Sequence, residues 1–170
     1  MSHTYTDLLF HVVFSTKGRA RLISDEIRAD LLAYIGGVVR KSGGKALLVN
    51  GLSDHVHMLV RLPADVPIAE CLRLVKANSS KWVHEKWPAR GDFAWQIGYA
   101  AFTVSLSQRD RVYRYIRDQE EHHRKQSFAE EMAALLTKYG ANVADVLEDS
   151  VAPEGALESG SRSPIADAMG

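Results

Sequence analysis

Three features of this 170-residue sequence predict an α+β fold. Short segments with apolar residues at every second position alternate with longer segments whose apolar residues recur every three or four positions. These segments follow one another in the order β-α-β-β-α-β, and helical patterns follow. The composition, 46% hydrophobic and 25% charged, is that of an ordinary globular protein. We therefore expect one domain built on a four-stranded antiparallel sheet.

The first strand is expected at residues 8–15, LLFHVVFS, which are apolar on nearly both faces. A strand of this kind belongs in the middle of a sheet, because both of its faces must be covered. The segment TKGRAR at 16–21 follows as a basic loop. Two interpretations of this loop stay open: a solvated connection, or a phosphate contact at the end of a strand.

A helix and a hairpin come next. Ser24 is a suitable helix N-cap, and the acids at 25–26 stand in the first turn, where the helix dipole favours negative charge. The glycines at 43–44 end the helix. A second strand at 46–50 and a turn at 51–54 then lead into a third strand, which predicts a hairpin.

The third strand opens with His55 and His57, two residues apart. Side chains two positions apart on a strand share one face, so the two imidazoles lie side by side. Such a pair can hold one divalent metal, although on spacing alone two half-buried structural histidines are the simpler interpretation. Asp54, directly before the pair, is either a hydrogen-bond partner of a ligand imidazole or only a turn residue.

The second helix begins after Pro67 and ends before Pro88. One side of it is basic and hydroxylated, a combination that can bind phosphates but is more often simply solvated. The residues on that side are Arg73, Lys76, Ser80 and Lys81.

The fourth strand is expected at 99–105, and a strongly polar helix at 108–125 follows it. Tyr115, Gln119 and His122 recur at helical spacing and project from one face of this helix. A phenol beside an amide and an imidazole is a plausible nucleophile with partners, and the alternative is a surface tyrosine that packs on a neighbouring element. A short helix at 129–140 follows.

This element order is that of the split βαβ, ferredoxin-like sandwich. The strand at 8–15 and the histidine strand are then the two central strands, and both helices of the repeat cover one face of the sheet. The polar tyrosine-bearing helix is the candidate to cover the other face.

Charge divides the chain into a domain at 1–140 and an acidic, Ala- and Ser-rich tail at 141–170. The domain carries 20 Lys and Arg against 15 Asp and Glu, an excess compatible with a nucleic-acid partner. The single cysteine, Cys71, excludes an intramolecular disulfide and a cysteine-built zinc site. The single cysteine fits a reducing cytoplasm, where we expect the protein to be. No apolar run has the length of a membrane span and the N-terminus lacks the pattern of a signal sequence, so we expect no membrane association.

Several of these segments together resemble the single-tyrosine HUH transposases of small insertion sequences, the insertion sequence 200/605 type. This family includes the transposases associated with repeated extragenic palindromes. The resemblance runs from about residue 8 to residue 131, and the segments that carry it stand in the same order along the chain. They are HVVFSTKGR at 11–19, GLSDHVHML at 51–59, LVKANSSK at 74–81, FAWQIGYAAFTVS at 93–105 and YIRDQEEHH at 115–123.

The resemblance implies a metal-dependent enzyme that cuts and rejoins single-stranded DNA. By position, His55 and His57 are the ligands of a Mg²⁺ or Mn²⁺ ion, and Gln119 is the third ligand. Tyr115 is the nucleophile that attacks a DNA phosphate, which leaves a 5′-phosphotyrosine link and a free 3′-hydroxyl. The family also implies a homodimer, in which the tyrosine helix of one subunit can complete the site of the other.

The resemblance further implies that hairpins at the DNA ends are recognised by a basic surface. The candidate DNA-binding residues are Lys17, Arg19, Arg73, Lys76, Ser80 and Lys81. Two other functions stay open: a domesticated relative that nicks host DNA with the same residues, and a non-catalytic module that binds single-stranded nucleic acid. The binding module leaves the histidine pair unexplained. The acidic segment after residue 141 departs from the family pattern and leaves open how the tyrosine helix is held.

Overall fold

The computed structural model describes residues 4–142 of the chain. The chain divides into two compact units, Met1–Met132 and Ala133–Gly170. The whole sheet lies in the first unit, while the last helix, α5 (Phe128–Lys138), begins in the first unit and ends in the second. The acidic tail expected at 141–170 lies outside the described residues, apart from residues 141 and 142.

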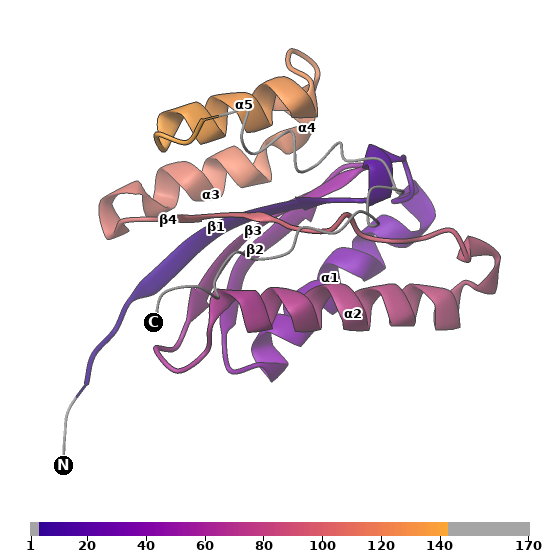
Figure 1. The fold of residues 1–170 in the computed structure, drawn as a ribbon, viewed down its shortest axis with the longest axis horizontal. Coiled ribbons are helices and arrows are strands. Elements are labelled where there is room, and N and C mark those ends of the chain that lie inside the picture. Colours follow the sequence, from indigo (N-terminus) through magenta and orange to yellow (C-terminus); the bar gives the residue numbers. More distant parts are fainter. Residues whose placement is uncertain (1–3, 143–170) are drawn as a thin grey trace, which may run out of the picture. The chain divides into compact units, whose positions relative to one another are not determined.

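A four-stranded antiparallel sheet forms the centre of the first unit (Figure 1). Its strands are β1 (Leu8–Ser15), β2 (Lys45–Gly51), β3 (His55–Leu62) and β4 (Ala100–Thr103). They lie in the order β2-β3-β1-β4, so the first strand and the histidine strand are central, as their two apolar faces predict. The expected ferredoxin-like α+β sandwich is confirmed.

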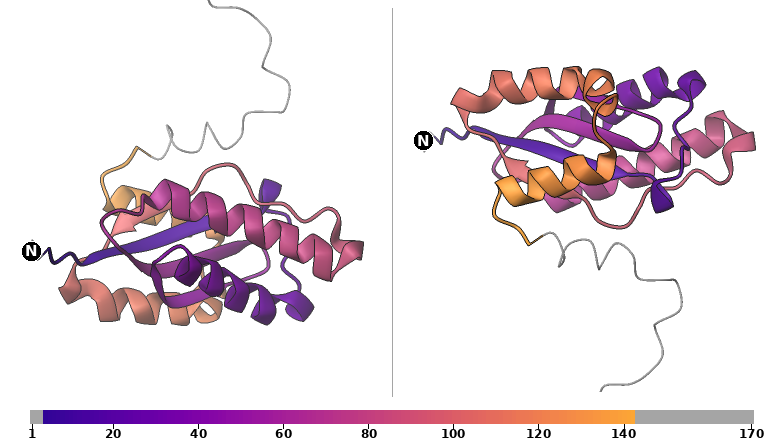
Figure 2. Two further views of the ribbon diagram at one scale, coloured as in Figure 1. Left: turned by 90° about the horizontal axis from the view of Figure 1, so that it is seen from below. Right: turned by 90° about the horizontal axis from the view of Figure 1, so that it is seen from above.

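Helices cover both faces of this sheet. The helices α1 (Asp25–Lys41) and α2 (Ile68–Lys86) lie side by side over one face (Figure 2). The helix α3 (Arg109–Arg117) covers the other face, where it packs against β2 and β3 (Figure 1). Short 3₁₀ turns at Lys17–Arg19 (η1), Pro88–Arg90 (η2) and Leu106–Gln108 (η3) complete the connections. Within the described residues, no helix is long and apolar enough to cross a membrane.

The two faces carry cores of different size. A large apolar core fills the space between the sheet and the α1–α2 layer, and the even-numbered residues of β1 and β3 contribute to it. The core under α3 is small and consists of Leu9, Leu59, Val104 and Ile116. Ile116 is the buried residue that α3 contributes, and Val112 and Tyr115 of the same helix pack against this core. Burial of one isoleucine stabilises a fold by about 1.5–3 kcal/mol.

The polar helix predicted as one piece at 108–125 is in fact two helices, and that prediction was wrong. It breaks at Asp118, with φ −94° and ψ 26°, between α3 and α4 (Gln119–His123). Asn50 of β2 explains the break, because its side-chain amide donates hydrogen bonds to the carbonyls of Ile116 (2.8 Å) and Arg117 (3.1 Å). These carbonyls lie at the end of α3, where the helix itself supplies no donors.

Candidate metal and tyrosine site

The histidine pair opens β3 on the face that α3 covers. His55 is 1% exposed and His57 is fully buried, and their ring centroids are 5.3 Å apart. The turn before the pair is tight, because a Cβ on Gly51 would lie 2.4 Å from the carbonyl oxygen of His55. Only glycine allows this approach. The turn and the strand together hold both imidazoles in fixed positions.

Each imidazole is held from behind through its Nδ1 atom. His55 Nδ1 lies 2.7 Å from the carboxylate of Asp54, and His57 Nδ1 lies 2.9 Å from Nε2 of His11 on β1. Of the two interpretations of Asp54, the structure supports the hydrogen-bond partner. Both Nε2 atoms are buried and lack a hydrogen-bond partner. The two imidazoles thus present free Nε2 atoms to the same side of the sheet.

Glu131, which the sequence analysis did not select, faces this pair. It lies on α5 within the first unit and is 3% exposed. Its Oε2 atom is 3.4 Å from His57 Nε2 and 4.0 Å from His55 Nε2. The ligand atoms of these three residues lie within 4.8 Å of one another, a spacing at which they can bind one metal ion.

The predicted nucleophile and third ligand meet at the same carboxylate. The phenol of Tyr115 donates a hydrogen bond to Glu131 Oε1, and the amide of Gln119 donates one to the same atom at 3.0 Å. The Oε1 atom of Gln119 is buried without a partner. Tyr115, Gln119 and the histidine pair, which the sequence only placed on separate elements, are therefore neighbours.

Two further aromatic residues close the site around His55. The imidazole of His123 lies 2.9 Å from Glu131 Oε2, and its centroid is 4.6 Å from that of His55. The Phe128 ring stacks on His55 at 4.2 Å between centroids. His122, the histidine that helical spacing selected, lies beside Tyr115 instead, at 4.9 Å between centroids.

The electrostatics of the cluster favour a charged carboxylate at Glu131 and a neutral imidazole at His57. Burial alone would raise the pKa of Glu131, but the polar groups that face it, above all His57 and then Tyr115 and Gln119, hold it well below its ordinary value. Burial lowers the pKa of His57, although Glu131 partly opposes this. Burial and then the bond to Glu131 raise the pKa of Tyr115. An ionised carboxylate and a neutral imidazole are the forms that bind metal.

The donor set fits a divalent metal. The buried side-chain nitrogen and oxygen atoms without a partner among residues 4–142 are His55 Nε2, His57 Nε2 and Gln119 Oε1. Unsatisfied buried polar atoms are costly and rare in native proteins, so three in one place call for an explanation. A cation bound between them and Glu131 would satisfy all three.

Two of the six candidate DNA-binding residues lie at the site. Lys17 and Arg19 form part of η1, directly after the end of β1 that pairs with His55. Arg19 has a positive φ of 55°, which is uncommon for a residue with a side chain. Its guanidinium carbon is 5.8 Å from the centroid of Phe128, the ring that stacks on His55.

The other four candidates lie on α2, across the sheet from the site (Figure 1). Arg73 forms a bidentate pair with Glu70, and Lys81 lies 3.8 Å from an oxygen of Glu85. Lys76 donates to the carbonyls of Gln96 and Gly98, while Ser80 is half-buried. The structure does not bring these four residues to the metal cluster.

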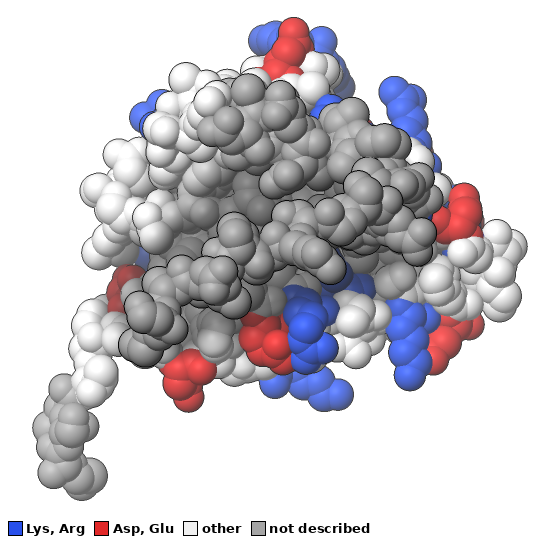
Figure 3. Space-filling model, in the orientation of Figure 1, with Lys and Arg blue, Asp and Glu red and all other residues white. Residues whose placement is uncertain are grey.

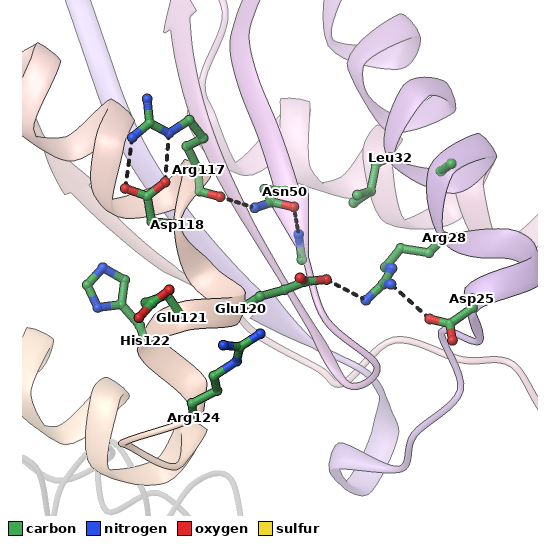
Figure 4. Close-up of a pocket in the computed structure, with 12 residues that line it drawn as sticks. Asp25, Arg28, Leu32, Asn50, Arg117, Asp118, Glu120, Glu121, His122 and Arg124 are labelled. Carbon is green, nitrogen blue, oxygen red and sulfur yellow. Dashed lines mark hydrogen bonds and ion pairs between the residues drawn. The ribbon is translucent and has the colours of Figure 1, made fainter.

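Charged side chains on the visible face are mixed rather than sorted by sign. Where Figure 3 shows described residues, basic groups lie beside acidic ones. A hollow of about 880 Å³ next to α4 has the same character (Figure 4). In it Arg28 lies between Asp25 (2.8 Å) and Glu120 (3.6 Å), and Arg117 pairs with Asp118 (2.7 Å). Because these charges neutralise one another, the hollow offers no strong anion site.

Comparisons with known proteins agree with this arrangement. A family model described as "Transposase IS200 like" matches residues 4–119. The transposase of insertion sequence element IS200 from Salmonella typhimurium is 26% identical over 128 residues, which are 70% of this chain and 81% of that protein. The ISDra2 transposase TnpA of Deinococcus radiodurans is 22% identical over 117 residues, 66% of this chain and 84% of that protein.

Two solved structures share the fold. A putative transposase from Deinococcus radiodurans superposes with a TM-score of 0.56 and 22% identity, over 70% of this chain and 96% of that one. A REP-associated tyrosine transposase bound to a REP hairpin superposes with a TM-score of 0.54 and 17% identity, over 72% and 73%. The family match includes His55, His57, Tyr115 and Gln119, but it ends before Glu131.

Proposed function

Because the chain belongs to the IS200-like transposase family, whose members cut DNA and transfer its strands, we propose that it is a metal-dependent transposase of single-stranded DNA. It cuts and rejoins DNA at hairpin-marked ends through a 5′-phosphotyrosine intermediate. The convergence of Tyr115, the histidine pair and Gln119 on one buried carboxylate carries this proposal. Neither a surface tyrosine nor a pair of structural histidines explains that convergence.

In this proposal four residues hold one Mg²⁺ or Mn²⁺ ion: His55, His57, Gln119 and Glu131. The first three are the ligands that the family resemblance implies, and Glu131 adds a carboxylate, the ligand type that magnesium and manganese prefer. When bound, the metal supplies charge to polarise the scissile phosphate. The protein supplies the buried, rigid cage, because every ligand is fixed by a strand, a helix or a hydrogen bond behind it.

Tyr115 is the nucleophile. Its oxygen forms a bond to the phosphorus atom of the cut strand, and the bond from phosphorus to the 3′-oxygen breaks, which yields a free 3′-hydroxyl. The phenolate is also a reasonable leaving group, so a 3′-hydroxyl can reverse the step and rejoin the strands. Burial and Glu131 both raise the pKa of the phenol, so Tyr115 keeps its proton and donates it in a hydrogen bond to Glu131.

The DNA and the assembly complete the proposal. The related structure bound to a REP hairpin supports hairpin ends as the DNA partner. Lys17 and Arg19, beside the site, are the residues best placed to contact the phosphates near the cut. We further propose a catalytic domain at 1–140 with an acidic tail at 141–170, a homodimer, and a cytoplasmic location where the DNA is found.

A covalent trapping experiment tests this function. Single-stranded hairpin oligonucleotides from the DNA that flanks this gene are mixed with the protein and Mg²⁺ or Mn²⁺, and a protein–DNA band that survives denaturation is sought. We expect this band for the wild type and its loss in Tyr115→Phe and His57→Ala. Tyr113→Phe is the matched control, because Tyr113 lies on the same helix but is partly exposed.

Each other outcome points to a different conclusion. A band that survives Tyr115→Phe would place the nucleophile elsewhere, with Tyr113 as the first residue to test. Tight hairpin binding without any band, on a DNA known to be the correct target, would favour the non-catalytic binding module. Cleavage without transfer of the cut strand to a second DNA would favour a domesticated nickase.

A further inference from the structure

A third buried histidine lies directly behind the metal-facing side of His57. His11 stands on the central strand β1 and is 2% exposed. Its Nε2 atom is 2.9 Å from Nδ1 of His57, and the two rings stack at 5.2 Å with an interplanar angle of 25°. In the sheet, His57 is opposite Val13, so His11 is its diagonal neighbour on the same face.

One hydrogen bond between two imidazole nitrogens contains one proton, which leaves two arrangements. If His11 donates, the neutral His57 carries its own proton on Nε2, and that atom has no lone pair for a metal. If His57 donates from Nδ1, its Nε2 lone pair is free and faces the cluster. The two arrangements exclude each other, so the role of His11 determines whether His57 can be a ligand.

When a metal is bound, the surroundings of His57 require the arrangement in which His57 donates from Nδ1 to His11. Nε2 is the buried atom without a partner, and it faces Glu131 at 3.4 Å. Nδ1 cannot serve as the ligand atom instead, because His11 occupies it. A metal held between His57 and Glu131 therefore requires His57 to donate and His11 to accept.

We propose that His11 is a positioning residue, which accepts a hydrogen bond from His57 Nδ1 and so keeps Nε2 of His57 available to the metal. This inference deepens the proposed function and rests on it for the role of the metal. His55 has a different support, since the carboxylate of Asp54 can only accept. A carboxylate fixes the tautomer of its histidine unconditionally, whereas His11 does so only when its own proton is on Nδ1.

A pair of nearly isosteric substitutions tests the acceptor role. In His11→Gln the amide oxygen can accept a hydrogen bond near the position of Nε2, and in His11→Met a similar side chain accepts none of comparable strength. Mn²⁺ binding to the full-length protein is measured by electron paramagnetic resonance, with His57→Ala as the reference for a lost ligand. Loss of such a supporting bond weakens metal binding by about 10- to 100-fold. We expect that loss in His11→Met and most of the wild-type affinity in His11→Gln.

Two results would overturn the proposal. One is wild-type Mn²⁺ affinity in a folded His11→Met protein, and the other is an equal loss in folded His11→Gln and His11→Met proteins. Folding is checked by circular dichroism and cooperative unfolding. Should either variant not fold, long-range ¹⁵N–¹H correlation spectra of the wild type saturated with Mg²⁺ decide the question. The ring protons of His57 and His11 must then both be on Nδ1, and a proton on Nε2 of His11 would disprove its role as the acceptor.

The measurement separates this inference from the transposase proposal. A protein that forms no covalent adduct with a DNA known to be the correct target, yet shows the contrast between His11→Gln and His11→Met in Mn²⁺ binding, would support His11 and contradict the transposase. A His11→Met protein that forms the adduct with the wild-type Mn²⁺ requirement would contradict His11 and support the transposase.

Discussion

At the scale of single residues, Glu131 connects all the parts of the site. Its two oxygens contact Tyr115, Gln119, His123 and His57. Each of these partners is buried at least in part, so none can exchange the contact for water at low cost. The carboxylate thus contributes to the stability of the fold as well as to the proposed metal site.

Replacement of Glu131 by Gln should therefore affect both properties. A neutral amide accepts fewer hydrogen bonds and turns its NH₂ group toward other donors, so we expect the free energy of unfolding to fall by about 1–3 kcal/mol. Mn²⁺ affinity should fall as well, because a charged ligand is lost. Urea denaturation and Mn²⁺ titration measure the two effects. Glu121→Gln, an exposed change on α4, is the control and should leave both unchanged.

At the scale of elements, the position of Tyr115 depends on how α3 ends. The side-chain amide of Asn50 on β2 donates hydrogen bonds to the last carbonyls of α3 and so fixes the end of that helix to the sheet. The turn at Asp118 that follows lets α4 present Gln119 to the same carboxylate as Tyr115.

We expect Asn50→Ala to loosen this junction. Two carbonyls lose their donor, which should lower the free energy of unfolding by about 1–2 kcal/mol and speed amide hydrogen exchange in α4. The matched control is Asn78→Ala, which removes an amide that donates to a carbonyl on α2 at 2.9 Å, away from the site. Equal exchange in α4 of both variants would show that Asn50 does not hold the junction.

The contact between α2 and the segment before β4 gives a pH-dependent prediction. Burial lowers the pKa of Lys76 from 10.5 to about 8, while the unfolded chain keeps the higher value. Between about pH 8 and pH 10.5 the unfolded state therefore binds more protons than the folded state, so this residue makes stability rise with pH in that window. The difference in unfolding free energy between wild type and Lys76→Met should shift in favour of the wild type from pH 8 to pH 10. A constant difference would contradict the lowered pKa.

At the scale of the whole first unit, the cluster joins elements that are distant in sequence. Its ligands come from β3, α4 and α5, so a bound metal would connect the central sheet to the helices that follow it. A ligand that binds the folded state alone stabilises it, by about 2.7 kcal/mol at one hundred times its Kd.

Mg²⁺ or Mn²⁺ should accordingly raise the melting temperature, and a chelator should reverse the rise. The same titration with His57→Ala should produce no rise, because a ligand is missing. Thermal unfolding followed by circular dichroism measures both. An equal rise in the two proteins would mean that the metal binds elsewhere.

The sequence by itself determined the element order, the central position of β1 and β3, and the shared face of His55 and His57. These properties are local, because the period of a strand or helix is set by neighbouring residues. Helical spacing selected Tyr115 and Gln119, and the family resemblance implied their roles as nucleophile and metal ligand. Their proximity to the histidines is a property that no spacing along the chain could show.

Tertiary structure alone decided which side chains surround the histidine pair, His55 and His57. Glu131 belongs to an acidic first turn that resembles any solvated helix start, and His11 is 46 residues from His57 along the chain. Their roles depend on which strands become neighbours and where a helix docks on the sheet. Such long-range packing leaves no periodic pattern in the sequence, so these two residues emerged only from the folded chain.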